Sequence, residues 1–221
     1  MPLVEAHHLY RFYHSGEDET LALRGVSFVA AAGELIAVMG PSGSGKSTLL
    51  NCLAGLDEPD GGYVVINGRR ISHRPEPERA AIRASMIGLV LQSGNLLEQF
   101  SIEENVWLQR HFAKLAKPES TPAEILNAVG LATRRHAYPS QLSGGEAARA
   151  ALAVALAASP ALLLADEPTG EVDAQTETKI VDLFKQHCER GGVAILATHS
   201  EALAAQANTV LRILDGQFVN G

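Results

Sequence analysis

The chain has few cysteines and no excess of basic residues, so it lacks the composition of a disulfide-rich protein or of a typical nucleic-acid-binding protein. Its 221 residues include two cysteines, Cys52 and Cys188, which are too few for a disulfide framework and lack the spacing of a metal site. Acidic residues outnumber basic ones and give a net charge of −7, which argues against a broad electrostatic grip on nucleic acid. We therefore expect a reduced, intracellular setting and no nucleic-acid partner.

Long hydrophobic runs are also missing. The most apolar stretch, residues 150–165, is divided by Ser159-Pro160, and each half is too short to cross a bilayer. The N-terminus has no basic segment followed by an apolar core, so no secretory signal is visible. We expect a chain that does not span a membrane, lies in the cytoplasm and reaches the inner face of a membrane only through a partner.

What the sequence does contain is a glycine-rich loop of the form G-x-x-x-x-G-K-[ST]. It follows the apolar run 34–39 and precedes a helix-like segment at 48–54, which is the strand–loop–helix context that a phosphate-binding loop needs. Lys46 can reach the outer phosphates of a nucleotide, and the Ser47 hydroxyl can ligate Mg²⁺. The candidate ATP-binding residues of this phosphate loop are Gly40, Pro41, Ser42, Gly43, Ser44, Gly45, Lys46, Ser47 and Thr48.

Two acids end an apolar segment far downstream. The segment 162–165 has the composition of a buried strand, and Asp166 and Glu167 follow it directly. A strand ending at the same sheet edge as the phosphate loop places Asp166 to hold Mg²⁺, and Glu167 to polarise an attacking water. The pattern therefore predicts hydrolysis as well as binding of a nucleoside triphosphate.

A second anion site is indicated by Leu142-Ser-Gly-Gly-Glu146, here called the signature turn. Ser143, Gly144 and Gly145 stand where an alanine-rich helix begins, and helix N-termini bind anions. Two phosphate-binding helix starts are difficult to reconcile with one nucleotide in a monomer. We hypothesise a head-to-tail homodimer in which Ser143 and Gly145 contact the γ-phosphate held by the partner's Lys46.

The three motifs together resemble the ATPase subunit of an ABC (ATP-binding cassette) transporter, and the match runs from about Leu3 to Val219. The resemblance implies an α/β fold with a phosphate-loop core, a mainly parallel sheet, an N-terminal antiparallel β-subdomain and an inserted α-helical subdomain. We expect a single domain over 1–221, with the core and β-subdomain at 1–92 and 150–221 and the helical subdomain near 93–149.

The resemblance also implies roles for single residues. Tyr13 matches the aromatic residue that stacks on adenine, although Tyr10 and Phe12 compete for that role. Gln92 matches the glutamine that meets the metal and the attacking water. Asp173 matches the loop that crosses the dimer interface, and His199 matches the histidine that contacts the γ-phosphate.

Several positions depart from the family pattern. Ala147 and Ala148 follow the signature turn where two glutamines are usual, Val154 replaces a common arginine, and Ser200 replaces the usual acid after His199. The catalytic set is intact, so we expect activity. The changes affect groups that brace the signature helix.

The sequence leaves the biological role open between three readings. The first, an ATPase subunit driving a separate membrane permease, resembles bacterial lipoprotein-release, macrolide-export and cell-division cassettes, where the work is export, extraction or force transmission. The second is a regulatory cassette that signals to a cell-envelope enzyme without cargo. The third is a soluble cassette outside transport, which the absence of a long coiled coil or a second cassette disfavours. Trp107 and Phe112 fit either core packing or a docking surface.

Overall fold

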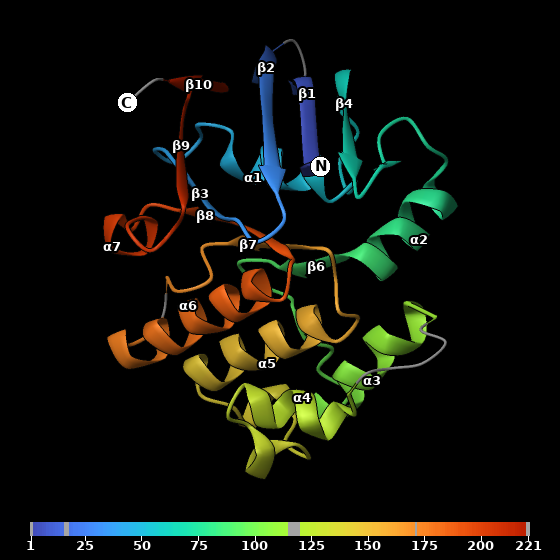
Figure 1. Ribbon diagram of the computed structural model, residues 1–221, viewed down its shortest axis with the longest axis vertical. Coiled ribbons are helices and arrows are strands. Elements are labelled where there is room, and N and C mark those ends of the chain that lie inside the picture. Colours follow the sequence, from blue (N-terminus) through green and yellow to red (C-terminus); the bar gives the residue numbers. More distant parts are fainter. Residues whose placement is uncertain (1, 16–17, 115–119, 171, 220–221) are drawn as a thin grey trace.

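The computed structural model describes residues 2–15, 18–114, 120–170 and 172–219, and its central sheet carries the phosphate loop (Figure 1). The strand order of this sheet is β10-β9-β3-β8-β7-β6. Neighbouring strands are parallel except in the β9–β10 hairpin. The strand bounds are β3 Leu35–Met39, β6 Ile87–Val90, β7 Leu162–Asp166, β8 Val193–Thr198, β9 Thr209–Leu214 and β10 Gln217–Val219.

The inner strands are apolar because both of their faces are covered, as is usual in parallel sheets. All of β3 and all of β8 are buried. Along β7, Leu162 and Leu164 point into one hydrophobic core, whereas Leu163 and Ala165 point into a second core on the opposite face. The sheet is thus a partition between two cores, which fixes the strand register.

A second, antiparallel sheet lies against the first core. Its strand order is β2-β1-β4-β5, and the long pair β1–β2 carries several bulges. Asn67 and Gly68 join β4 to β5 with φ values of 46° and 73°, as expected for a tight hairpin turn. The bounds are β1 Pro2–Ser15, β2 Asp18–Ala31, β4 Gly61–Ile66 and β5 Arg69–Arg70.

Helices cover the two faces of the central sheet unequally (Figure 1). Helix α1 packs in the first core with the antiparallel sheet, while α5 and α6 pack on the opposite face and α3 and α4 lie beyond them. The bounds are α1 Lys46–Leu53, α2 Glu76–Met86, α3 Ile102–Phe112, α4 Pro122–Ala128, α5 Gly144–Leu156, α6 Ala174–Glu189 and α7 Glu201–Ala204, with 3₁₀ turns at Ala132–Arg134 and Pro139–Gln141.

Capping residues explain where three of these helices begin. Ser101, Thr121 and Ser143 each accept a hydrogen bond from the backbone N–H three residues later, and a glutamate at that later position bonds back to the cap. This reciprocal pair satisfies backbone donors that a helix start leaves free. The cap of α5 therefore sets the position of the signature turn.

The structure confirms the predicted α/β fold, including the mainly parallel sheet and the antiparallel N-terminal sheet. It adds two helices that the sequence did not suggest, α2 and α7. Residues 69–74 form the short edge strand β5 and a turn before α2. The subdomain boundaries near 92 and 150 remain a prediction. Within the described ranges, no helix has both the length and the apolar character that a membrane crossing requires.

Candidate functional site

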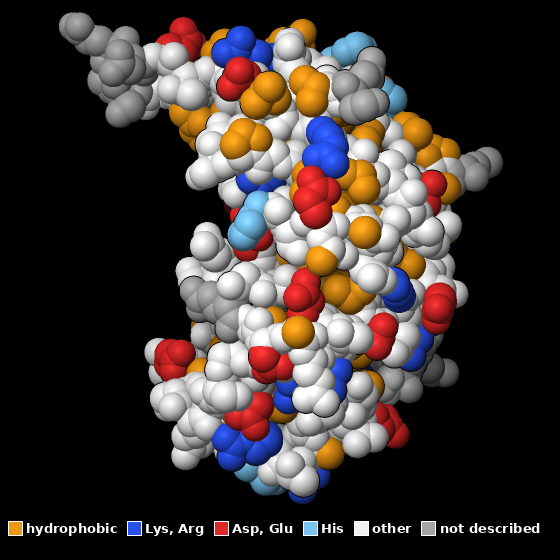
Figure 2. Space-filling model, turned by 90° about the vertical axis from the view of Figure 1, so that its left-hand side faces the viewer, with side chains coloured by type: hydrophobic (Ala, Val, Ile, Leu, Met, Phe, Trp, Pro, Cys, Tyr) orange, Lys and Arg blue, Asp and Glu red, His pale blue; other side chains and the backbone are white. Residues whose placement is uncertain are grey.

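Four strand ends bring the candidate residues to one edge of the central sheet. The phosphate loop follows β3, Gln92 follows β6, Asp166 ends β7, and His199 follows β8. Parallel strands present their carboxyl ends at the same edge, so residues from four distant parts of the sequence line one cleft of about 1040 Å³. The molecule is visibly hollowed between its upper and lower parts (Figure 2).

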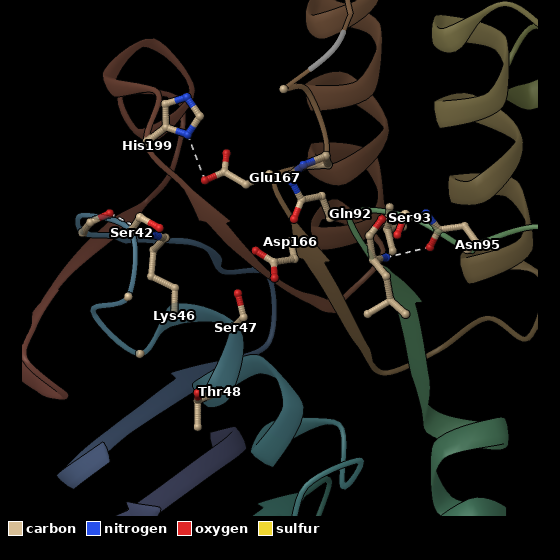
Figure 3. Close-up of a pocket in the computed structure, with 18 of the residues that line it drawn as sticks. Ser42, Lys46, Ser47, Thr48, Gln92, Ser93, Asn95, Asp166, Glu167 and His199 are labelled. Atoms are coloured by element: carbon tan, nitrogen blue, oxygen red, sulfur yellow. Dashed lines mark hydrogen bonds and ion pairs between the residues drawn. The ribbon is translucent and has the colours of Figure 1, made fainter. Parts of the chain in front are cut away.

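The phosphate loop is closed around the Lys46 ammonium (Figure 3). Lys46 Nζ donates to the carbonyl oxygens of Gly40 and Pro41 at 2.7 and 3.0 Å, and the side chain is 9% exposed. Gly45 has a φ of 108°, and a Cβ there would lie 2.5 Å from the Ala22 carbonyl oxygen, so only glycine fits. The loop thus forms the cradle that the sequence predicted, with α1 beginning at its end.

Oxygen donors suited to Mg²⁺ lie beside this cradle. The Ser47 hydroxyl and the Asp166 carboxylate point into the same space, and Asp166 lies between Ser47 and Gln92 in this view (Figure 3). Within the described ranges, no group of three or more His, Cys, Asp and Glu side chains is arranged as a metal site. A site with only a few protein oxygen ligands is typical of Mg²⁺, because this ion usually keeps waters and substrate phosphates as its other ligands.

Glu167 and His199 form a hydrogen-bonded pair above the phosphate loop (Figure 3). His199 Nδ1 lies 2.9 Å from Glu167 Oε1, and the Thr198 hydroxyl lies 3.5 Å from Oε2. The Glu167 backbone has a φ of 49° and its N–H donates to the Ala197 carbonyl oxygen at 2.9 Å. A left-handed conformation is uncommon for glutamate and is frequent at active sites. This conformation turns the chain at Glu167 away from the direction of β7.

Gln92 lies on an ordered turn. Asn95 holds this turn closed, because its side chain accepts from the Leu91 N–H at 2.7 Å and donates to the Leu91 carbonyl oxygen at 2.6 Å. Asn105 on α3, only 4% exposed, holds the next segment through hydrogen bonds to the backbone of Leu97, Phe100 and Ser101. Two asparagines thus fix the path of the chain that leads from Gln92 to α3.

Tyr13 lines the cleft on its β-sheet side, close to Thr48 of α1. Its hydroxyl donates to Asp57, and the Arg11 guanidinium lies over its ring. Tyr10 instead packs over Gly25 and does not line the cleft within the described residues. This arrangement favours Tyr13 over Tyr10 for the stacking role, and Phe12 is likewise not part of the cleft lining.

The residues of the signature turn differ in whether they line the cleft. Gly144 lines the cleft, whereas Ser143 and Gly145 are not among its lining residues in the described part of the chain. Ser143 is exposed, and its hydroxyl and backbone N–H both donate to Glu146. The hydrogen bond from the Ser143 N–H is the main cause of the lowered pKa of Glu146. The carboxylate therefore stays ionised and continues to accept the hydrogen bonds that hold the turn.

Asp173 is exposed and caps α6. Its carboxylate accepts from the backbone N–H and the hydroxyl of Thr176, both at 2.9 Å, and these bonds lower its pKa. Thr176 also touches the signature turn, since a Cβ at Gly145 would lie 3.1 Å from the Thr176 methyl. The structure therefore links Asp173 to Gly145 through the Thr176 side chain.

The structure brings together most of the predicted residues but not all. Among the described residues, the phosphate loop apart from Ser44 shares the cleft with Tyr13, Gln92, Gly144, Asp166, Glu167 and His199. The buried Ser44 lies outside the lining, as do Ser143, Gly145 and Asp173. The sequence did not mark four residues that contact candidate residues, or the turn that carries Gln92, in the structure: Arg11, Asp57, Asn95 and Thr176. No motif marks these residues, because each acts on a candidate residue through a contact that only the fold creates.

Comparison with known proteins gives a consistent result. A family model described as "ABC transporter" matches residues 23–170. An ABC transporter ATP-binding protein of Escherichia coli K12, YbbA, is 43% identical over 98% of this chain and 96% of its own length. A macrolide export ATP-binding/permease protein of Hyphomonas neptunium, MacB, is 40% identical over 99% of this chain, which spans about a third (34%) of that relative.

Solved structures agree with the fold described above. The cassette MJ0796, in a dimeric post-hydrolysis state bound to ADP and Pi, superposes with a TM-score of 0.91 and 34% identity over 98% of this chain and 97% of that one. A second dimeric structure of the same cassette gives a TM-score of 0.90 with 33% identity over the same shares of the two chains.

Proposed function

This chain belongs to the ABC transporter family, and we propose that it is an ATP-hydrolysing subunit that dimerises around two ATP molecules and drives a separate membrane permease. One observation carries the proposal. The phosphate loop, Asp166, Glu167 and His199 line one cleft at the carboxyl edge of the parallel sheet. A nucleotide cradle, a metal-binding acid and a water-polarising acid are the parts that phosphoryl transfer to water requires.

The residues divide the work of hydrolysis. The loop N–H groups and Lys46 bind the triphosphate and offset the charge that develops on its oxygens. Glu167 accepts a hydrogen bond from the attacking water and aims it at the γ-phosphorus. His199 holds the Glu167 carboxylate in place through the 2.9 Å contact. It lines the same cleft as the phosphate loop, and its proposed second task is to contact the γ-phosphate. Gln92 orients the water from the side of β6.

Ser47, Asp166 and Gln92 are the residues that would hold Mg²⁺, with Asp166 acting through water. When bound, the ion adds positive charge beside the phosphates. The fit rests on the oxygen donors of these side chains, on the common direction of Ser47 and Asp166 (Figure 3), and on the place of Gln92 in the lining of the same cleft.

A homodimer is proposed because Ser143 of the signature turn is exposed, and Ser143 and Gly145 lie outside the lining of their own chain's cleft in the described part of the chain. Ser143 is at the start of α5, where backbone N–H groups and the helix dipole favour an anion. A second copy placed head to tail supplies this turn to the γ-phosphate, and Asp173 lies beside it through Thr176. The two solved structures of MJ0796 are dimeric, which supports a homodimer.

A membrane permease is the proposed partner. The relative from Hyphomonas neptunium is named as an ATP-binding/permease protein, which supports a link between cassettes of this kind and a permease. On α3, apolar side chains that would pack inside a core are open to solvent: Trp107 is 54% and Phe112 61% exposed. This surface favours docking over core packing and would place the chain on the inner face of a membrane.

Phosphate release from ATP by the purified chain tests the proposed activity. We expect release with Mg²⁺ and none in excess chelator. A folded chain that binds ATP yet releases no phosphate at any protein concentration, alone or with its permease, contradicts the proposal. Co-purification from detergent-solubilised membranes tests the partner, and loss of the association in Trp107→Ala, but not in the exposed control Asn127→Ala, would locate the docking surface.

A further inference from the structure

Tyr13 is held on one face and at one end by neighbours that the sequence motifs do not include. The Arg11 guanidinium carbon lies 4.7 Å from the centre of the Tyr13 ring, as in a cation–π contact. The Tyr13 hydroxyl donates to Asp57 Oδ2. The other oxygen of the same carboxylate, Oδ1, pairs with Arg11 Nη2 at 2.7 Å. Each of these three side chains therefore contacts the other two, and they form one set.

The backbone around this set is also fixed. Asp60 Oδ2 accepts from Arg11 Nη1 at 3.1 Å and from the Phe12 backbone N–H at 2.7 Å. The Asp57 N–H donates to the carbonyl oxygen of Asn51 in α1, at 3.1 Å. Arg11 is therefore anchored to two carboxylates on the loop after α1, the helix that begins at the phosphate loop.

Charge keeps this set together. Burial opposes the charge on Arg11, but its hydrogen bonds to Asp57 and Asp60 outweigh that effect and raise the pKa of Arg11. Burial and the hydrogen bond to Asp57 raise the pKa of Tyr13, so the phenol stays protonated and remains a donor. The ring is thus held in one orientation at neutral pH.

We propose that Arg11 and Asp57 are positioning residues for the nucleotide base, which stacks on the face of Tyr13 that Arg11 leaves open. This inference rests on the proposed function, in which Tyr13 stacks on the adenine of ATP. One face of the ring is covered by the guanidinium, so only the opposite face can receive the base. A ring already fixed at its hydroxyl loses less conformational freedom on stacking, which strengthens binding by about three- to tenfold.

Calorimetric titration with ATP and with inorganic triphosphate, which has no base, tests the inference. Asp57→Ala is expected to weaken ATP binding about three- to tenfold and to leave triphosphate binding unchanged. Asp57→Asn, which retains an acceptor for the Tyr13 hydroxyl, should recover part of the loss. The matched control Asp182→Ala, at an exposed aspartate of α6, should behave like the unaltered chain.

The Tyr13→Ala background separates positioning from a general structural effect. Asp57→Ala or Arg11→Met added to Tyr13→Ala should cause no further loss of ATP affinity, because the residue they position is gone. Equal loss for ATP and triphosphate, an added loss in the Tyr13→Ala background, or unchanged ATP affinity in Asp57→Ala would each overturn the inference alone. Failure of the folded, unaltered chain to bind ATP would overturn the proposed function and this inference with it.

Discussion

Glu167 Oε1 and His199 Nδ1 lie 2.9 Å apart, although 32 positions separate the two residues in the sequence. The pairing arises because β7 and β8 are parallel neighbours, with Asp166 opposite Ala197, so the residues after each strand meet at the same edge. In the proposed mechanism, Glu167 polarises the attacking water, and the contact with His199 holds its carboxylate in one orientation.

The first prediction concerns Glu167→Gln. The amide cannot polarise water as a carboxylate does but keeps the shape of the side chain. We expect ATP affinity within about threefold of the unaltered chain and hydrolysis reduced by at least about 100-fold. Equilibrium binding and phosphate release check the two effects separately. Glu177→Gln, in α6 and not among the described residues that line the cleft, serves as the control. Full hydrolysis by Glu167→Gln would refute the role of this acid.

The second prediction concerns Lys46→Ala. The ammonium is the charged donor at the centre of the phosphate loop, and hydrogen bonds to charged groups contribute about 1.5–3 kcal/mol. ATP affinity should therefore fall by about tenfold to 100-fold, measured by calorimetric titration. The exposed Lys179→Ala is the control for loss of one positive charge. Equal affinity for ATP in Lys46→Ala and the control would contradict the assignment.

The third prediction concerns Asn105→Ala. The buried amide bonds to the backbone at Leu97, Phe100 and Ser101, so truncation leaves several polar groups without their partner. We expect a loss of about 2 kcal/mol in the free energy of unfolding, measured with urea. The exposed Asn127→Ala in α4 should change it by less than about 0.5 kcal/mol. A similar small change for Asn105→Ala would show that this amide does not hold the segment.

The fourth prediction concerns pH. Burial lowers the pKa of His187, whose ring packs against Gly192. Below its ordinary value near 6.5, the unfolded chain binds a proton that the folded chain does not, so stability falls as pH falls. The slope is up to about 1.4 kcal/mol per pH unit, and above pH 6.5 the effect disappears.

Urea unfolding between pH 7.5 and 5.5 measures this slope. His187→Gln should unfold with a smaller loss of stability over that range than the unaltered chain, whatever its absolute stability. His14→Gln, at an exposed histidine side chain (72%), should leave the slope unchanged. Identical slopes for all three chains would exclude His187 as the source.

The fold was largely predictable because its signals are local and strong. The unbroken apolar run at 193–198 and the Asp215-Gly216 turn lie where the structure has β8 and the β9–β10 hairpin. The sequence did not mark helix α2, whose cap is Pro75 and whose first turn contains Pro77. Proline is compatible with a helix start, where its missing N–H needs no partner.

The placement of a candidate residue in the cleft was predictable where a motif fixes its position in the chain, as the phosphate loop does for Lys46. It was not predictable where a residue acts across the fold. Asp57 reaches Tyr13 from 44 positions away, and Thr176 reaches Gly145 from the start of another helix. The open choice for Trp107 could not be resolved from helical spacing, because an exposed apolar residue and a buried one have the same spacing on an amphipathic helix.

Sedimentation of Glu167→Gln with ATP and Mg²⁺ tests the central claim, that each triphosphate is enclosed by the phosphate loop of one copy and the signature turn of another. The account predicts a shift from monomer to dimer with ATP, a return to monomer with ADP, and no dimer when Ser143→Arg is added. A chain that binds ATP but sediments as a monomer at every concentration, or that dimerises equally well with Ser143→Arg, would contradict it.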